Sequence, residues 1–147
     1  MKNFIHEIKI DKNSVLFIGS KISEEGIISE SCYLDLINEI FNRYPDKNII
    51  YIPHRGEDLE KISRIENIER VVVKKIGYSV EFLGVNEWEL PCKVISFYST
   101  ALLTMKSLYN VDVESYFFDY TGSPYKGYID SIYDFYRGEI NVIEDLH

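Results

Sequence analysis

Polar side chains that could bind a phosphate or move a proton stand directly after apolar runs. The clearest case is the run at residues 49–52, which is followed by Pro53, His54 and Arg55. An uninterrupted apolar run predicts a strand buried on both faces, and Pro53 predicts its end because proline cannot donate to a sheet. His54 could donate to a phosphate or protonate a leaving oxygen, or be purely structural. Arg55 could pair with a phosphate or with Glu57, or be a surface charge.

Two adjacent hydroxyl residues stand at the next such junction. Ser99 and Thr100 follow the apolar run 93–98 and precede a helical pattern. The first turn of a helix has free N–H groups and the positive end of the dipole, so it can bind an anion. The hydroxyls would add donors to a phosphate there. Ser99 could also serve only as the helix N-cap.

Three carboxylates occupy comparable places. Glu81 follows the β-branched run 71–73, and Glu24 and Glu25 precede Gly26 after the apolar run 14–20. A carboxylate at the end of a strand can hold the two hydroxyls of a ribose, which is the role we assign to Glu81. Glu24 or Glu25 could act as a general base if burial raised its pKa. Each of the three could equally be a solvated surface acid.

The alternation of strands and helices predicts one Rossmann-like, three-layer α/β domain over residues 1–147, with helices on both faces of a parallel sheet. All the candidate groups then lie at its carboxyl edge, where α/β sheets bind ligands. We expect an edge strand near residues 4–10, a loop at 85–92 containing Trp88, and an exposed tail at 140–143. The expected strands are 14–20, 48–52, 71–73, 93–98 and 111–118, and the expected helices are 31–44, 57–65, 77–83, 99–109 and 128–137.

The composition excludes several classes of protein. A net charge of −8 argues against binding a nucleic-acid backbone, which needs a basic face. Cys32 and Cys92 are isolated in sequence, which favours free thiols in a reducing cytoplasm. The three histidines form no ligand pair, so no metal site is expected. The sequence has no secretory signal pattern and no run long enough to span a membrane.

The segments 51–57 and 96–102, together with Glu81, resemble the C-terminal donor half of bacterial lipooligosaccharide sialyltransferases, glycosyltransferase family 52. Related sialyl- and polysialyltransferases carry a His-Pro motif, an acid-acid-Gly motif and a Ser-Ser/Thr motif. Their counterparts here are His54-Arg55, residues 24–26 and Ser99-Thr100, with Arg55 in place of the proline. The resemblance covers about residues 14–120.

The resemblance implies a function in the synthesis of surface lipooligosaccharide or capsule polysaccharide. The chain would be the CMP-sialic acid-binding domain of an inverting sialyltransferase with the GT-B arrangement, which needs no metal or other cofactor. His54, Arg55, Ser99 and Thr100 would bind the CMP phosphate, with His54 also helping CMP to leave, and Glu81 would bind the ribose. Glu24 or Glu25, with Glu24 preferred, would deprotonate the glycan acceptor.

A chain of 147 residues cannot hold both GT-B domains, so the acceptor domain would be absent or supplied by another chain. The C-terminal helix and tail could contact that domain or a second copy in a homo-oligomer. The implied location is the cytoplasm, with peripheral contact at the inner membrane. Two alternatives stay open, namely a non-catalytic nucleotide-binding module and a protein-interaction module with a flavodoxin-like fold.

Overall fold

The computed structural model describes residues 8–87 and 89–147 and contains a six-stranded sheet in the order β3-β2-β1-β4-β5-β6. All five strand pairings are parallel. This is the strand order of the doubly wound nucleotide-binding fold, so the predicted α/β fold is confirmed. The strands are β1 (Lys9–Ile18), β2 (Asn48–Ile52), β3 (Val71–Val73), β4 (Glu89–Ser96), β5 (Asp112–Tyr116) and β6 (Asn141–Ile143).

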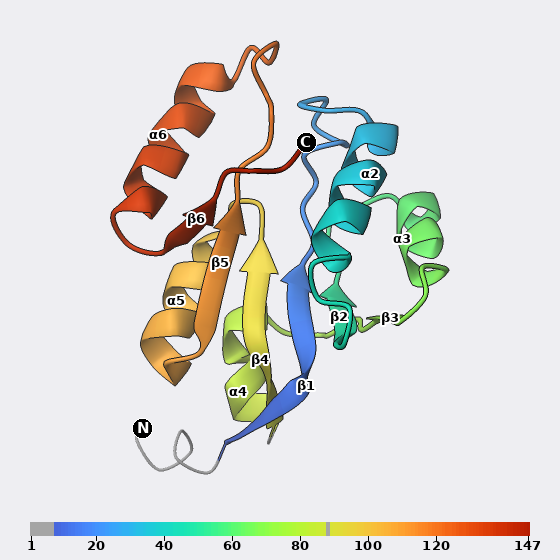
Figure 1. Ribbon diagram of the computed structural model, residues 1–147, viewed down its shortest axis with the longest axis vertical. Coiled ribbons are helices and arrows are strands. Elements are labelled where there is room, and N and C mark those ends of the chain that lie inside the picture. Colours follow the sequence, from blue (N-terminus) through green and yellow to red (C-terminus); the bar gives the residue numbers. More distant parts are fainter. Residues whose placement is uncertain (1–7, 88) are drawn as a thin grey trace.

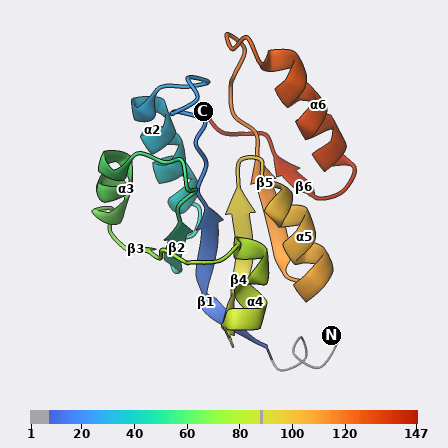
Figure 2. The same cartoon turned by 180° about the vertical axis from the view of Figure 1, so that it is seen from behind.

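Helices cover both faces of this sheet and make the domain three layers thick (Figure 1). Helix α2 lies over one face, and α4 and α5 lie over the other, as the view from behind shows (Figure 2). Helix α6 follows β5 and contributes buried side chains to the apolar clusters of both faces. The helices are α2 (Glu30–Phe41), α3 (Leu59–Glu66), the 3₁₀ turn η1 (Val80–Phe82), α4 (Leu83–Asn86), α5 (Thr100–Tyr109) and α6 (Lys126–Arg137).

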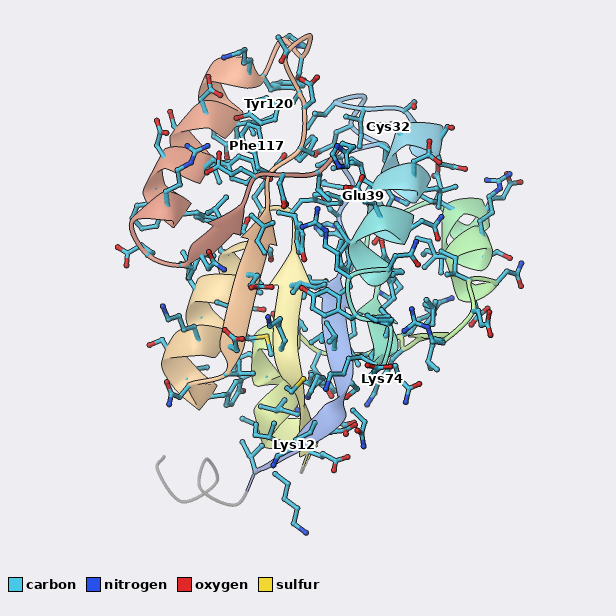
Figure 3. The ribbon with its side chains drawn as sticks, in the orientation of Figure 1. Lys12, Cys32, Glu39, Lys74, Phe117 and Tyr120 are labelled. Atoms are coloured by element: carbon cyan, nitrogen blue, oxygen red, sulfur yellow. The ribbon has the colours of Figure 1, made fainter. Side chains whose placement is uncertain are left out.

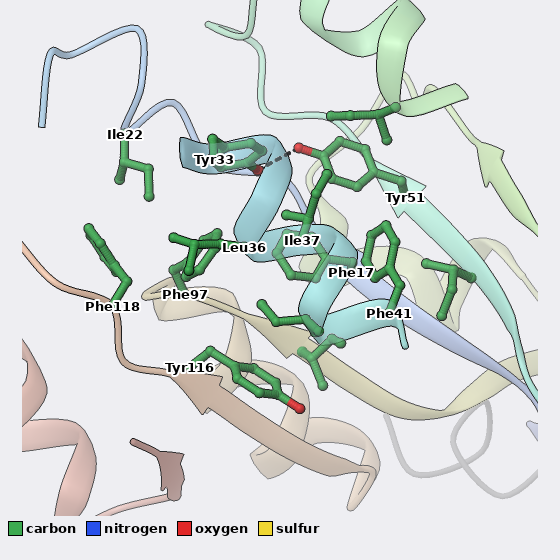
Figure 4. Close-up of a cluster of buried hydrophobic side chains, with 14 of the residues drawn as sticks. Phe17, Ile22, Tyr33, Leu36, Ile37, Phe41, Tyr51, Phe97, Tyr116 and Phe118 are labelled. Carbon is green, nitrogen blue, oxygen red and sulfur yellow. Dashed lines mark hydrogen bonds between the residues drawn. The ribbon is translucent and has the colours of Figure 1, made fainter. Parts of the chain in front are cut away.

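The core on the α2 face is rich in aromatic rings (Figure 4). Phe17 of β1 stacks on Tyr51 of β2 with ring centroids 5.5 Å apart and meets Phe41 of α2 edge-on at 5.6 Å. Phe97, which directly follows β4, also contacts Phe17 edge-on. These side chains alternate with residues that point to the opposite face, which explains why residues 15–18 of β1 and 49–52 of β2 are apolar without interruption.

Three local predictions need correction. Strand β1 runs from Lys9 to Ile18, with a shift in its register against β4 between Asp11 and Val15, so residues 9 and 10 belong to a central strand and not to a separate edge strand. Residues 89–92 form the start of β4 rather than a loop, and residues 89–91 pair with residues 9–11 of β1. The rest of the predicted edge strand and Trp88 lie outside the described residues.

The predicted exposed tail is the third error. Residues 141–143 form β6, which pairs with β5, and Ile140 before it is buried. The segment continues past β6 across the sheet, where Asp145 bonds Arg43 of α2 at 2.7 Å. Within the described residues, no helix has the length and apolar character needed to span a membrane. Both Cys32, labelled in Figure 3, and Cys92 are free thiols.

Candidate functional site

The strand order reverses between β1 and β4, and a cavity of about 300 Å³ opens at the carboxyl ends of the strands there. In parallel α/β sheets this reversal leaves a crevice, because the connections on its two sides run in opposite directions. The cavity is lined by residues that follow β2, β3 and β4, and we call it the first cavity. All five predicted ligand-binding residues line it, namely His54, Arg55, Glu81, Ser99 and Thr100.

The imidazole of His54 is oriented by its own turn. The backbone N–H of Gly56 donates to Nδ1 of His54 at 3.0 Å. An Nδ1 that accepts a hydrogen bond carries no proton, so the neutral ring carries its hydrogen on Nε2. Partial burial, followed by the charge of Lys21, lowers the pKa of His54 below its ordinary value. At neutral pH the ring is therefore an uncharged donor through Nε2.

We expect proton–nitrogen correlation spectra to show this tautomer directly. The chain has three histidines, so the His54 ring can be identified by its loss in His54→Gln. It should titrate below the ordinary value of about 6.5. A lowered histidine pKa favours the neutral ring in the folded state, so its contribution to stability is present above the unfolded pKa and is lost as pH falls through the folded one. A ring protonated on Nδ1 at neutral pH would contradict this.

Ser99 and Thr100 lie at the beginning of α5, where they were predicted. Ser99 has extended backbone geometry and is the N-cap, and its Oγ accepts from the N–H of Ala101 at 3.3 Å. The capping role considered from the sequence is thus present. It does not exclude ligand binding, since Ser99 and Thr100 both also line the first cavity. The end of β4 itself is fixed because Ser96 Oγ donates to the carbonyl of Ile18 in β1.

Glu81 faces the first cavity from η1. Its Oε1 accepts from Ser79 Oγ at 2.8 Å, and its backbone carbonyl accepts from the hydroxyl of Tyr109 in α5 at 2.5 Å. Ser79 occupies the N-cap position of η1 with extended backbone geometry, but its side chain makes no cap hydrogen bond there. Instead, the serine positions the carboxylate that we predicted to bind a ribose.

The two acids of the 24–26 loop have different surroundings. Glu24 is partly buried and accepts from the N–H of Asp58 and from Lys61, each at 2.9 Å. Burial alone would raise the pKa of Glu24, but these hydrogen bonds outweigh it and lower that pKa. Glu25 is exposed, pairs loosely with Lys21 at 3.8 Å, and lines a cavity beside the first one. A base must have a free lone pair within reach of its substrate, so these contacts favour Glu25 over the preferred Glu24.

A buried polar network under the His54 turn was not foreseen. The carboxylate of Glu57 accepts from the backbone N–H of His54 at 2.9 Å and from the hydroxyl of Tyr51 at 2.6 Å. It also pairs with the fully buried ammonium of Lys61 at 3.0 Å. The option that Glu57 pairs with Arg55 is therefore wrong. The spacing of Glu57 and Lys61, one helical turn apart, was the signal that could have revealed this pair.

The network extends from β2 to the end of β1. Tyr33 and Tyr51 share a hydrogen bond of 2.6 Å, drawn in Figure 4, and the N–H of Ser20 donates to Tyr33. Since Tyr51 gives its hydrogen to Glu57, Tyr33 must be the donor to Tyr51. Burial raises the pKa of both phenols well above the ordinary value, so both keep their hydrogens. One chain of hydrogen bonds thus joins Ser20 to the turn that carries His54.

Among the described residues, no group of three or more His, Cys, Asp and Glu side chains is arranged to hold a metal ion. The cationic groups near the first cavity are instead Arg55, which lines it, and Lys21, which lines the neighbouring cavity. With the N-terminus of α5 they give an otherwise acidic protein a local site with donors for an anion. The arrangement suits a ligand with one phosphate and one diol.

No curated protein matches the sequence. Among solved structures, KpsC of Thermosulfurimonas dismutans, described as a beta Kdo 2,4 transferase, is similar at 13% identity with a TM-score of 0.49. The match covers 75% of this chain and 35% of that one, so the chain spans little more than a third of the length of that structure.

The family model described as alpha-2,8-polysialyltransferase matches residues 1–116. The match includes every residue predicted for the site, from Glu24 to Thr100. The resemblance to sialyltransferases is thereby confirmed at the level of this family, whereas placement in glycosyltransferase family 52 stays a prediction. Because the matched segment is well over half of the sequence, the chain belongs to the alpha-2,8-polysialyltransferase family.

Proposed function

We propose that this chain is the CMP-sialic acid-binding domain of a bacterial sialyltransferase that acts in the synthesis of a surface lipooligosaccharide or capsule polysaccharide. The observation that carries the proposal is the convergence of His54, Arg55, Glu81, Ser99 and Thr100 on one cavity. They come from segments far apart in sequence, and each supplies a group that a nucleoside monophosphate requires. Membership of a sialyltransferase family supports CMP as the nucleotide.

In this proposal each residue has one role. Ser99, Thr100 and the N–H groups at the beginning of α5 bind the phosphate, with Arg55 adding positive charge. His54 donates from Nε2 to a phosphate oxygen and stabilises the charge that develops as CMP leaves. Glu81 accepts hydrogen bonds from the ribose hydroxyls. The reaction is a direct displacement with inversion at the anomeric carbon, in which Glu25 takes the proton of the acceptor hydroxyl.

Thermal unfolding with and without nucleotide tests the proposal. A ligand that binds only the folded state stabilises it by about 2.7 kcal/mol at one hundred times its Kd, which raises the Tm of a domain of this size by roughly 5–10 °C. We expect this shift with CMP and a smaller one with UMP or GMP. His54→Ala should abolish most of it, whereas His147→Ala should keep it. Glu81→Gln with CMP and wild type with 2′-deoxy-CMP should show the same partial loss.

The outcomes separate this proposal from the alternatives. No shift with any nucleotide would contradict nucleotide binding and would favour the flavodoxin-like interaction module. A shift with CMP but no sugar transfer in the presence of any acceptor or acceptor domain would make the chain a non-catalytic nucleotide-binding module. A shift that is equal for all three nucleotides would leave the site without the base selectivity that a CMP-sugar enzyme needs.

A further inference from the structure

The segment that carries Glu81, residues 76–86, is attached to the rest of the fold at one main point. Figure 2 shows it crossing behind the sheet from β3 to α4, which lies beside α5. Most of its hydrogen bonds are local and join residues within 79–87. Among the described residues, the one hydrogen bond that joins this segment to another element comes from Tyr109 of α5.

The side chain of Tyr109, the last residue of α5, contacts this segment at two positions. Its hydroxyl donates to the backbone carbonyl of Glu81 at 2.5 Å. A Cβ added to Gly84 would lie 2.3 Å from a ring carbon of Tyr109, so the ring fills the space directly against the backbone there. Tyr109 is buried, and burial raises the pKa of its hydroxyl, which therefore keeps its hydrogen and remains a donor. The backbone of residues 81–84 is thus held against one side chain of α5.

Both ends of α5 therefore serve the first cavity. The beginning of the helix provides Ser99, Thr100 and the free N–H groups of the first turn, and its last residue holds the backbone of Glu81. Glu81 lines the same cavity. A helix of ten residues is a rigid body about 15 Å long. The distance between the phosphate donors and Glu81 is then fixed by α5 and not by the connection that carries Glu81.

Under the proposed function this distance affects the choice between ribose and 2′-deoxyribose. A carboxylate distinguishes the two sugars most strongly when it accepts from both ribose hydroxyls, because the deoxy sugar then leaves an acceptor unpaired. A shift of about 1 Å in Glu81 would stretch these hydrogen bonds and weaken them. The phosphate donors at the beginning of α5 would not move with it. A residue that fixes Glu81 should therefore control the preference for the sugar and not the affinity for the phosphate.

We propose that Tyr109 is a positioning residue of the nucleotide site. It holds Glu81 where the carboxylate meets the ribose diol while the beginning of α5 binds the phosphate, and it thereby sets the preference for ribose over 2′-deoxyribose. The proposal rests on the proposed function and adds a residue that determines which sugar the nucleotide must carry. Tyr109 acts through Glu81, since Tyr109 is not part of the lining of the first cavity.

Calorimetric titration with CMP and with 2′-deoxy-CMP tests this inference through the ratio of the two Kd values. Wild type should bind CMP about 10- to 100-fold more tightly than 2′-deoxy-CMP, as expected for hydrogen bonds to a charged group. Tyr109→Phe keeps the ring against Gly84 but loses the bond to Glu81, so it should lower this ratio by about three- to tenfold. The Kd of 2′-deoxy-CMP, which reflects the phosphate and the base, should stay within about twofold of wild type.

The chain offers matched controls for both contacts of Tyr109. Tyr120 is also buried and donates its hydroxyl to Asp130 at 2.7 Å, so Tyr120→Phe removes a comparable hydrogen bond and should leave the ratio unchanged. Gly84→Ala would displace the ring of Tyr109 and should lower the ratio at least as much as Tyr109→Phe does. Gly77→Ala lies in the same segment, but its added Cβ would meet nothing within 4 Å, so it should keep the ratio of wild type.

A double variant shows whether Tyr109 acts through Glu81. Glu81→Gln alone should lower the ratio, and adding Tyr109→Phe should lower it no further, because both changes affect one interaction. A further fall in the double variant would overturn the inference. A ratio in Tyr109→Phe equal to that of wild type would also overturn it, including the case in which both nucleotides lose affinity equally, as a purely structural role predicts.

Amide hydrogen exchange, which needs no ligand, separates failure of this inference from failure of the proposed function. The N–H groups of Phe82 and Leu83, which bond within the segment, should exchange faster in Tyr109→Phe and at the rate of wild type in Tyr120→Phe. If wild type binds CMP and prefers it to 2′-deoxy-CMP but exchange in Tyr109→Phe is unchanged, the proposed function stands and this inference fails. If wild type binds neither nucleotide, the proposed function fails, and the role of Tyr109 in sugar preference fails with it.

Discussion

Replacing Lys61 by methionine should lower the free energy of unfolding by about 3–5 kcal/mol, because it leaves buried carboxylates without their cation. The ammonium of Lys61 has no exposed surface, pairs with Glu57 and Glu24, and donates to the carbonyl of Ser20. Methionine has a similar length and fills the same space, so the loss of stability reflects the missing charge and not a cavity. Urea unfolding at neutral pH measures it.

The pH dependence of this loss identifies its cause. Burial raises the pKa of Glu57 even beside Lys61, and removing the cation should raise it further. For a carboxyl whose folded pKa is raised, the contribution to stability is fully present below the unfolded pKa, about 4.3, and is lost as pH rises through the folded pKa. The deficit of Lys61→Met should therefore be smallest near pH 4 and grow toward pH 8. Lys75→Met, at an exposed position, is the control. A deficit that is the same at every pH would contradict this explanation.

Replacing Gly19 by alanine should both destabilise the fold and disable the first cavity. A Cβ at this position would lie 1.9 Å from Oε1 of Glu57 and 2.8 Å from the hydroxyl of Tyr51. Neither group can move freely, since Glu57 holds the N–H of His54 and the hydroxyl of Tyr51. Overpacking of this kind costs roughly 1–3 kcal/mol, and we expect the upper end of that range.

We expect Gly19→Ala to impair CMP binding more severely than it impairs folding. Displacing Glu57 releases the backbone of His54, so Gly19→Ala should show little or no CMP-dependent rise in Tm at temperatures where it is still folded. Gly122→Ala, where an added Cβ meets nothing within 4 Å, should behave like wild type in both measurements. A Gly19→Ala protein that binds CMP normally would show that the network does not position His54.

The sequence predicted correctly those strands whose residue pattern is compatible with no other secondary structure. The runs at 49–52 and 71–73 are continuous and apolar, and the strands predicted at 48–52 and 71–73 are both present. Strand β6 was not predicted because it has only three residues and pairs with a single neighbour at the edge of the sheet. A strand this short shows almost no alternation of apolar and polar residues. The start of β4 was assigned to a loop in the sequence analysis. It contains Pro91, which cannot donate to a sheet, and it pairs with the part of β1 that precedes the register shift between Asp11 and Val15.

The candidate site was predictable as a position but not as a set of interactions. Polar residues after predicted parallel strands must lie at one edge, and the structure places the five ligand-binding candidates there. Whether an acid is free or bonded depends on contacts across the fold, as with Glu24 and residues 58 and 61. Lys61 looked like an ordinary lysine of an amphipathic helix, because nothing in its local sequence shows that a neighbouring loop covers it.

The hydrogen-bond chain from Ser20 to His54 has a consequence for the kinetics and entropy of binding. The backbone that carries His54 is held by bonds internal to the protein and not by the ligand. A site that is already ordered loses little conformational entropy on binding. Its association rate is then limited by encounter and orientation rather than by a loop that must first fold. Differences in affinity between nucleotides should therefore appear mainly in how quickly each one dissociates.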